Sequence, residues 1–281
     1  MDPVQQKYDR LRSLLAGLDS VLVAFSGGVD STLLLRVARD TLGDRALAVT
    51  AVSPLFPASD QREADELAER MGATRILIPF RELLIPGFSA NPPDRCYLCK
   101  RELFRLFLEK AGELGLAHVA DGSNLDDLDD YRPGLRALKE LGILSPLREC
   151  GLTKVEIRRL SHQLGLPSWD KPARPCLATR FPYGAEITAE RLAMLERCEE
   201  FLRARGFLSP RVRFHGDTAR VEVGTEEMPR ILEPAVRQSL VSFFKSSGFT
   251  YVSLDLEGFR AGSMNESLAP PTFSHPAEGK P

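Results

Sequence analysis

The stretch "AFSGGVDSTLLL", residues 24–35, joins an apolar run to a helical pattern through two adjacent glycines. The run "SVLVAF" (20–25) predicts a buried strand, and the helical pattern begins near Asp30. Gly27 and Gly28 allow the tight backbone turn between them. Backbone N–H groups and the positive end of the helix then converge on one point. The sequence therefore predicts an anion site where the strand meets the helix.

The side chains of this turn suit a bound phosphate. Ser26 and Ser31 add hydroxyl donors, and Asp30 can hold a magnesium ion against a pyrophosphate. The Lys-Ser/Thr pair of a Walker A loop is missing. A plain glycine turn is the alternative, but five fixed positions make a chance match on the order of one in ten thousand. The stretch closely resembles the PP-loop of ATP pyrophosphatases, which implies that ATP is cleaved between its α and β phosphates and that an acceptor oxygen is adenylated.

Short apolar runs alternate with helical patterns on both sides of this turn. Further buried strands are predicted at 45–52, 75–78 and 117–121, with amphipathic helices between them. Strands that alternate with helices imply a parallel sheet covered on both faces. We therefore expect an α/β domain over residues 1–167, which the PP-loop resemblance implies is of the adenine nucleotide alpha hydrolase-like kind.

The pattern changes after this domain. Four prolines interrupt residues 166–186, so no helix can continue there, and we expect a linker or site loop over 168–186 that carries Cys176. A helix, two alternating strands, a second helix and a last strand follow. This order predicts a small α+β domain with an antiparallel sheet over 187–268. Residues 269–281 are expected to form a disordered tail.

Length and composition limit the class of protein. The chain of 281 residues suits two domains, and its 39 acidic and 37 basic residues nearly cancel, which disfavours a nucleic-acid partner. No stretch approaches the roughly 20 apolar residues of a membrane span, and the start lacks the apolar core of a signal peptide. We expect a cytoplasmic protein. Its five cysteines are then reduced thiols, ligands or catalytic groups rather than a disulfide framework.

Three of the five cysteines lie in predicted loops or at a helix start. Cys96 and Cys99, at C-x-x-C spacing, follow a long Gly/Pro/Asn-rich stretch and precede a helix, whose N-terminus lowers a thiol pKa. Cys176 lies in the proline-rich segment between Arg174 and Arg180, whose charges also favour the thiolate. These positions predict a set of three ligands.

Three thiolates suit one kind of metal site better than another. Structural zinc takes four protein ligands, and the four histidines lie in unrelated contexts. Three thiolates can hold a 4Fe-4S cluster whose fourth iron stays open to an exogenous ligand such as hydrosulfide. Unconnected cysteines or a simple redox pair are the alternative. Cys150 and Cys198 fit ordinary structural thiols.

Five further stretches, in this order, match one branch of the PP-loop superfamily. They are "DYRPGL" (130–135), "RFPYG" (180–184), "RVRFH" (211–215), "ARVEV" (219–223) and "YVSLDLEGFRAGSMN" (251–265). With them the chain resembles, from about residue 10 to 268, the LarE family of ATP-dependent sulfur transferases, which make the nickel-pincer nucleotide cofactor of lactate racemase. The resemblance implies that ATP and magnesium adenylate a carboxylate of pyridinium-3,5-biscarboxylic acid mononucleotide. Sulfur then displaces AMP, and the other carboxylate follows.

The resemblance also bears on the sulfur source. In the best-known branch the sulfur comes from the enzyme's own cysteine, which matches Cys176 and is left as dehydroalanine. This sequence departs from that branch at Cys96 and Cys99. Some relatives use three cysteines to bind a 4Fe-4S cluster that carries the transferred sulfide. The set of Cys96, Cys99 and Cys176 predicts that version, with sacrifice of Cys176 as the alternative.

Six charged positions match the family as well. The cations match residues near the phosphates or the anionic substrate, and they are Lys100, Arg180, Arg211 and Arg213. Glu199 and Glu222 match acidic positions of the second domain's site. Solvated surface charges are the alternative for each. In a strand of period two, Arg211 and Arg213 share one face and can act together.

Two rival functions are open on the sequence. One is a tRNA-thiolating PP-loop enzyme with the same cluster chemistry, and the other is a nucleotide-binding regulatory module without catalysis. The family resemblance implies further partners: sulfide or a sulfur donor, other proteins of the nickel-pincer pathway, and copies of the chain itself in a homo-oligomer, a hexamer.

Overall fold

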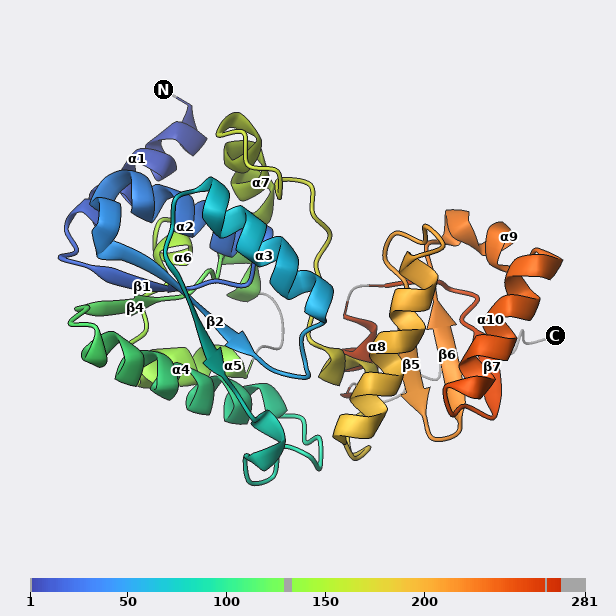
Figure 1. Ribbon diagram of the computed structural model, residues 1–281. Coiled ribbons are helices and arrows are strands. Elements are labelled where there is room, and N and C mark those ends of the chain that lie inside the picture. The colour runs from blue at the N-terminus through green and yellow to red at the C-terminus, as the bar shows by residue number, and fades with distance from the viewer. Residues whose placement is uncertain (1, 129–132, 261, 269–281) are drawn as a thin grey trace, which may run out of the picture. The chain divides into compact units, whose positions relative to one another are not determined.

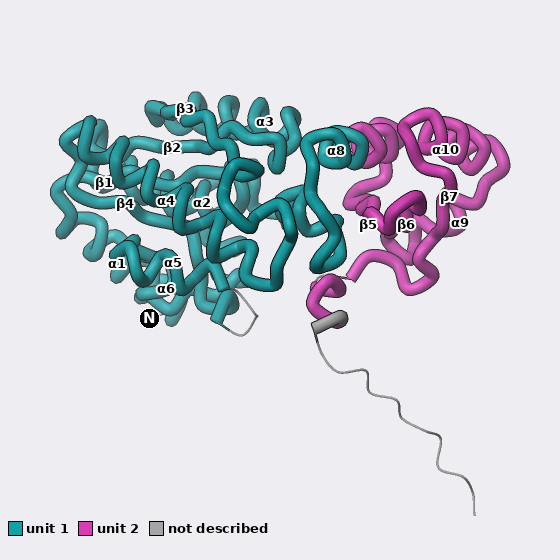
Figure 2. Tube along the Cα trace, turned by 90° about the horizontal axis from the view of Figure 1, so that it is seen from below, with its two compact units in different colours: residues 1–196 teal, residues 197–281 magenta. Residues whose placement is uncertain are grey.

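The computed structural model divides the chain into two compact units (Figures 1 and 2). The first comprises residues 1–196 and the second residues 197–281, so the division falls inside α8 (Ala189–Arg203). No helix in the described part of the chain is long and apolar enough to cross a membrane. The residues that the structure describes are 2–128, 133–260 and 262–268.

Parts of three stretches used in the sequence argument lie outside the described residues. They are the first three positions of "DYRPGL", residue 261 within the last matching stretch, and the expected tail at 269–281.

Four parallel strands form the sheet of the first unit, in the order β3-β2-β1-β4. Each coincides with an apolar run of the sequence. The edge strand, residues 75–79, contains no buried residue, so the prediction of a buried strand there is wrong. The strands are β1 (Val21–Ala24), β2 (Ala46–Val52), β3 (Arg75–Pro79) and β4 (His118–Ala120). The predicted parallel α/β sheet is confirmed.

Helices cover both faces of this sheet (Figure 1). On one face α2 packs against α1 and α7, and on the other α4 packs against α5. α2 carries three consecutive buried leucines and is therefore buried around most of its circumference, deep in the core behind the glycine turn. The helices of the unit are α1 (Pro3–Ala16), α2 (Val29–Leu42), α3 (Ala58–Arg70), α4 (Arg95–Glu113), α5 (Gly134–Glu140), α6 (Pro146–Glu149) and α7 (Lys154–Gln163).

The order of the strands reverses beside β1. The chain runs outward from β1 to β2 and β3, and then returns to place β4 on the other side of β1. Ligands of open α/β sheets bind outside the carboxyl ends of the strands at such a point. The glycine turn after β1 and the loop after β4 approach closely there, because a Cβ on Gly122 would lie 3.0 Å from the main-chain N of Ser31.

The second unit contains a three-stranded sheet, β5-β6-β7, with α9 (Met228–Ile231) and α10 (Pro234–Ser246). β5 and β6 pair antiparallel, but β6 and β7 pair parallel, so the expected antiparallel sheet is mixed. The connection through α9 and α10 returns the chain to the end of the sheet where β6 began, which makes the last pair parallel. The strands are β5 (Arg211–His215), β6 (Thr218–Glu222) and β7 (Tyr251–Leu254).

Candidate active site

The turn after β1 is a compact loop closed by its own hydroxyl and amide groups. The Ser31 hydroxyl donates to the Gly28 carbonyl over 3.3 Å and lies 3.2 Å from the Ser26 hydroxyl. The Gly28 N–H donates to the same Ser26 oxygen over 3.3 Å. Since α2 begins at Val29, its free N–H groups open at this loop. The structure thus brings the predicted phosphate-binding residues together at a helix N-terminus.

The two glycines of this loop are not equivalent. Gly27 has φ of +69°, and a Cβ there would lie 3.0 Å from the Cβ of Ala64 in α3. Gly28 has φ of −78°, and its nearest neighbour is the Ser26 hydroxyl at 3.3 Å. We therefore expect Gly27→Ala to lower the free energy of unfolding by about 2 kcal/mol, from left-handed backbone strain and crowding of α3. Gly28→Ala, the matched control, should lower it by less than about 1 kcal/mol. Urea denaturation measures both, and equal losses would contradict the assignment of strain to Gly27.

Asp30, the expected magnesium ligand, is engaged by other side chains. Its Oδ2 lies 2.5 Å from Nζ of Lys154, and its Oδ1 accepts a 3.3 Å hydrogen bond from Asn124 Nδ2. A second ammonium group, that of Lys171, donates to the Gly27 carbonyl over 3.2 Å. The sequence reasoning missed both lysines, because no local pattern links positions 154 and 171 to a loop more than 100 residues earlier.

Lys100 is directed toward the same edge of the sheet. Its Nζ lies 3.7 Å from Oδ2 of Asp121, which directly follows β4 and is buried. Asp121 also accepts a 2.7 Å hydrogen bond from Ser145 Oγ and another from Ser123. The chain of α5 passes so close that a Cβ on Gly134 would lie 2.7 Å from Cδ of Lys100. The predicted cation is therefore held beside the carboxyl end of β4.

The three predicted ligand cysteines come together inside the first unit. Cys96 and Cys99 lie in the first turns of α4, which begins earlier than expected, and their spacing of three places them on one side of the helix. The Cys99 pKa is raised by burial first and then by the neighbouring charges of Cys176, Glu82 and Cys96. The Cys176 pKa is likewise raised by burial first, with Cys96 adding to the shift. We call these three residues the three-cysteine group.

These directions correct one expectation. A helix start and flanking arginines were predicted to lower the thiol pKa values, but burial outweighs both for Cys99 and Cys176. Arg180 does lower the Cys176 pKa, against the larger effect of burial. Arg174 acts elsewhere, because its guanidinium pairs with Asp60 of α3 at 2.6 Å. A group that binds thiolates would offset the burial penalty.

The segment after Cys176 is held against the start of α4 by buried polar side chains. Asn91, with φ of +53°, donates from Nδ2 to the Pro182 carbonyl over 2.7 Å. Arg95 is buried and donates to the Ala178 carbonyl over 3.0 Å and to the Asn91 side chain. The Arg95 charge also lowers the Cys176 pKa. Sequence reasoning passed over both residues, although they lie just before the C-x-x-C motif.

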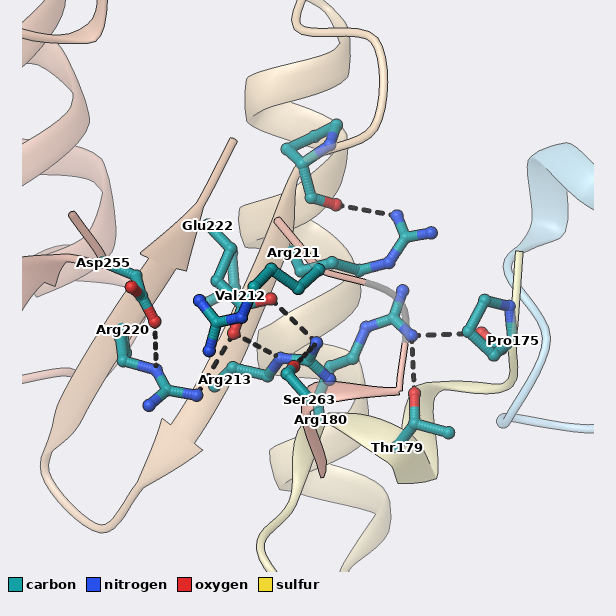
Figure 3. A network of polar contacts seen from close by, with 12 residues as sticks. Pro175, Thr179, Arg180, Arg211, Val212, Arg213, Arg220, Glu222, Asp255 and Ser263 are labelled. Atoms are coloured by element: carbon teal, nitrogen blue, oxygen red, sulfur yellow. Dashed lines mark hydrogen bonds and ion pairs between the residues drawn. The ribbon is translucent and has the colours of Figure 1, made fainter. Parts of the chain in front are cut away.

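Arg180 holds the main chain around Cys176. Its NH1 donates to the Pro175 carbonyl over 3.1 Å and to Thr179 Oγ1 over 2.8 Å (Figure 3), and it lies 3.4 Å from the Cys176 carbonyl oxygen. The guanidinium is buried, so its charge acts at short range on the thiol. Arg180 therefore fixes the position of Cys176 and opposes the rise in its pKa.

A buried carboxyl group, that of Glu82, lies near the three-cysteine group. Its Oε1 accepts a 2.7 Å hydrogen bond from Ser53 Oγ, while its Oε2 has no partner among the described residues. Ser53 also accepts from Leu55 N–H over 3.0 Å, and the Leu55 carbonyl accepts from Leu177 N–H over 2.9 Å. Glu82 thus stabilises the loop of Ser53 and Leu55, to which Leu177, the residue after Cys176, is hydrogen-bonded.

Burial raises the Glu82 pKa above its ordinary value of 4.5. The folded state then favours the protonated acid, and its stability falls as the pH rises from 4.5 through the folded-state pKa. Glu82→Gln should remove this loss. We expect the free energy of unfolding of the metal-free wild type, measured in urea from about pH 5 to about pH 8, to fall relative to the variant. A difference that stays constant with pH would contradict this. Glu109→Gln, at an exposed position of α4, is the control.

In the second unit the predicted acidic residues are buried and paired. Glu222 accepts two hydrogen bonds from Arg213, from Nε to Oε1 over 2.9 Å and from NH2 to Oε2 over 2.7 Å (Figure 3). Arg220 NH2 adds a 3.1 Å contact to Glu222 and pairs through Nε with Asp255 at 3.5 Å. Glu222 is therefore not a solvated charge, and it orients Arg213 across the β5-β6 pair.

Glu199 and Arg211 are also enclosed. Glu199, on α8, accepts from Val212 N–H over 3.1 Å and pairs with Arg203 at 3.3 Å. The Arg211 guanidinium lies 4.9 Å from the Phe259 ring centroid and donates to a main-chain carbonyl. Glu199 thus ties α8 to β5. The structure brings the predicted charged residues of this unit to one end of β5.

The donor set of the three-cysteine group fits an iron-sulfur cluster in chemistry. Within the described ranges, no three His, Cys, Asp or Glu side chains are arranged around a single metal ion. A 4Fe-4S cluster binds each thiolate through a different iron, so its ligands lie farther apart than those of one ion. Soft thiolates so close that Cys96 and Cys176 raise the pKa of Cys99 suit that arrangement.

Comparison with known proteins places the chain among relatives. No family model matches it. An uncharacterized protein of Synechocystis sp. is 45% identical over 265 residues, 94% of this chain and 99% of that protein. A GMP synthase (glutamine-hydrolyzing) of Phaeosphaeria nodorum is 26% identical over 231 residues, 70% of this chain and 42% of that protein.

One relative carries a specific name. Pyridinium-3,5-bisthiocarboxylic acid mononucleotide synthase of Lactiplantibacillus plantarum is 40% identical over 271 residues, 95% of this chain and 97% of that protein. The similarity spans the PP-loop, the proline-rich segment and the second unit alike. The chain therefore belongs to the family of this synthase, the LarE family.

Proposed function

We propose that the protein is an ATP-dependent sulfurtransferase that converts the carboxylates of pyridinium-3,5-biscarboxylic acid mononucleotide into thiocarboxylates, in the biosynthesis of the nickel-pincer cofactor of lactate racemase. Family membership supports an ATP-using enzyme. The observation that carries the proposal is that the PP-loop and the three-cysteine group belong to one compact unit. A group that activates a carboxylate and a source of sulfur are thus parts of the same body.

The first proposed step is adenylation. A carboxylate oxygen of the substrate attacks the α-phosphorus of ATP, the bond to the β-phosphate breaks, and pyrophosphate leaves. N–H groups at the start of α2 bind the phosphates, and Asp30 would hold a magnesium ion, which would neutralise charge on the leaving group when bound. Lys100, fixed by Asp121, adds a positive charge at the edge of the sheet.

The second proposed step transfers sulfur. Cys96, Cys99 and Cys176 would hold a 4Fe-4S cluster, which would supply sulfide when bound. Sulfide displaces AMP from the acyl carbon, and turnover is catalytic in protein. The raised pKa values of Cys99 and Cys176 support a ligand role, because iron offsets the penalty of a buried thiolate.

A second candidate route consumes Cys176 itself. Its thiolate attacks the acyl adenylate and AMP leaves. Loss of the Cα proton of this residue to solvent, with cleavage of the Cβ–S bond, then releases the thiocarboxylate and leaves dehydroalanine in the chain. The buried charges of Arg95 and Arg180 support this route, because both lower the Cys176 pKa and so favour the nucleophilic thiolate. The two routes differ in the number of products formed per chain.

We further propose roles for the remaining parts of the chain. Residues 1–167 carry the nucleotide, 168–186 carry the sulfur residue, and 187–268 bind the anionic substrate through Arg211 and Arg213. Glu222 positions Arg213, and Glu199 positions β5. The proposed protein is a cytoplasmic homo-oligomer, a hexamer, that works with a sulfur donor and other proteins of the nickel-pincer pathway.

The test combines substrate turnover with iron analysis. The protein, as purified and after anaerobic reconstitution with iron and sulfide, is mixed with ATP, magnesium and the biscarboxylate nucleotide. Pyrophosphate release that depends on the nucleotide, with thiocarboxylate detected by mass spectrometry, is the expected result. No pyrophosphate release would sink the proposal and leave a regulatory module. Binding of tRNA that weakens steeply with salt, together with tRNA thiolation, would favour the tRNA enzyme instead.

A further inference from the structure

Two lysines from distant segments end on the PP-loop. A Walker A loop carries its own lysine, which reaches the β and γ phosphates, but this loop has none. Lys154, the first residue of α7, lies 2.5 Å from the Asp30 carboxylate. Lys171, in the proline-rich segment, donates to the Gly27 carbonyl over 3.2 Å. Folding therefore supplies the positive charges that the motif itself lacks.

Both ammonium groups are paired with carboxylates. Lys154 is paired with Asp30, and Lys171 lies 2.6 Å from Glu63 of α3. Neither carboxylate can remain close to a bound triphosphate without repulsion unless a metal ion intervenes. An ATP–magnesium complex keeps a net negative charge, which two ammonium groups can neutralise. The ion pairs therefore mark cations that can exchange a carboxylate partner for a phosphate partner.

We propose that Lys154 and Lys171 are further phosphate-binding residues of the ATP site, which contact the β and γ phosphates, and that Asp30 and Glu63 hold them until the nucleotide binds. This inference rests on the proposed function, in which ATP is the nucleotide. Release of Asp30 from Lys154 frees its carboxylate for magnesium. Release of Lys171 from Glu63 leaves the proline-rich segment attached to α3, because Arg174 still pairs with Asp60 at 2.6 Å.

Calorimetric titration of Lys154→Gln and Lys171→Gln with ATP in excess magnesium, and with AMP, tests the contact. A charge-assisted hydrogen bond to phosphate predicts ATP binding about 10- to 100-fold weaker in each variant. AMP, which lacks the β and γ phosphates, should bind within about 3-fold of wild type. Equal weakening of ATP and AMP binding, or unchanged ATP binding, would overturn the inference. Lys171→Arg, which keeps the charge, should recover part of the ATP affinity.

Glu63→Gln separates phosphate binding from a structural tie between the proline-rich segment and α3. If Lys171 binds phosphate, removal of its competitor leaves ATP binding as tight as in wild type or tighter. If Lys171 serves only to tie the segment to α3, Glu63→Gln weakens ATP binding in parallel with Lys171→Gln, and the inference fails. Glu63 also pairs with Arg174 at 3.0 Å, but Arg174 keeps its 2.6 Å pair with Asp60 in Glu63→Gln. Opposite effects of Glu63→Gln and Lys171→Gln on ATP affinity therefore identify phosphate binding by Lys171.

Lys7→Gln is the matched control. It breaks the 2.7 Å ion pair between Lys7 and Glu156 of α7. The Lys7 and Glu156 side chains are 31% and 18% exposed, similar to the 31% and 22% of Lys154 and Asp30. ATP affinity should be unchanged in this variant. If the wild-type protein shows no ATP binding in this titration, the proposed function itself is refuted. Wild-type binding that both lysine variants retain would refute only the lysine inference.

Discussion

Cys176→Ala is expected to abolish thiocarboxylate formation while leaving substrate-dependent release of pyrophosphate. The variant lacks the sulfur that either binds the cluster or is transferred, so product formation should fall by at least about 10³-fold. The contacts of Arg95 and Arg180 that hold this segment go to the main-chain carbonyls of Ala178 and Pro175, which the substitution keeps. Adenylation by the PP-loop should therefore continue. Product is measured by mass spectrometry and pyrophosphate by a coupled assay.

Variants at the other cysteines decide which sulfur route operates. With a cluster, Cys96→Ala and Cys99→Ala should lose iron and product together, and wild type should form many products per chain. If Cys176 is sacrificed instead, Cys96→Ala and Cys99→Ala each still form one product per chain, and each wild-type chain that forms product loses one sulfur atom. Cys198→Ala, at a buried position of α8, is the control and should keep activity. Product at the wild-type yield from Cys176→Ala would contradict both routes.

Asp30→Asn is expected to lower the rate of pyrophosphate release by about 10²- to 10³-fold. The carboxylate that would hold magnesium against the pyrophosphate is lost, so charge on the leaving group is no longer neutralised. The same change frees Lys154 from its 2.5 Å pair. ATP binding measured without magnesium should therefore be as tight as in wild type, even though catalysis is impaired. We therefore expect Asp30→Asn to lower kcat and to leave the affinity for ATP unchanged.

Magnesium dependence checks this assignment. Wild-type rates should rise and saturate with added magnesium, whereas the rate of Asp30→Asn should respond weakly. Asp44→Asn, which breaks the 3.0 Å pair with Arg39 at an exposed position, is the matched control and should behave as wild type. A variant that keeps the wild-type rate and magnesium response would show that Asp30 does not hold the metal ion.

Local patterns were enough for the sheet and the phosphate loop. Apolar runs of four to eight residues mark the four parallel strands, and the two glycines with their flanking serines mark the turn after β1. These features depend on neighbours in sequence, namely side-chain period and permitted φ values. The third strand of the second unit was misjudged in direction, since direction depends on where the α9 and α10 connection ends.

The cysteines show where local reasoning stops. Their positions indicated a set of three, but the direction of their pKa shifts depends on burial, which no flanking residue reveals. Asn91 and Arg95, which bring Cys176 to the start of α4, bond to main-chain atoms about 80 to 90 residues away. Such contacts leave no periodic pattern.

Sequence alone accounts for the phosphate loop and for the strands of the parallel sheet, because each is encoded by residues close together in the chain, and it identifies three candidate ligand cysteines by their residue type and loop context. Only folding places Lys154 and Lys171 on the PP-loop and Glu82 near Cys99. The strand order brings the carboxyl ends of β1 and β4 together, and burial in the folded unit raises the pKa values of Cys99 and Cys176.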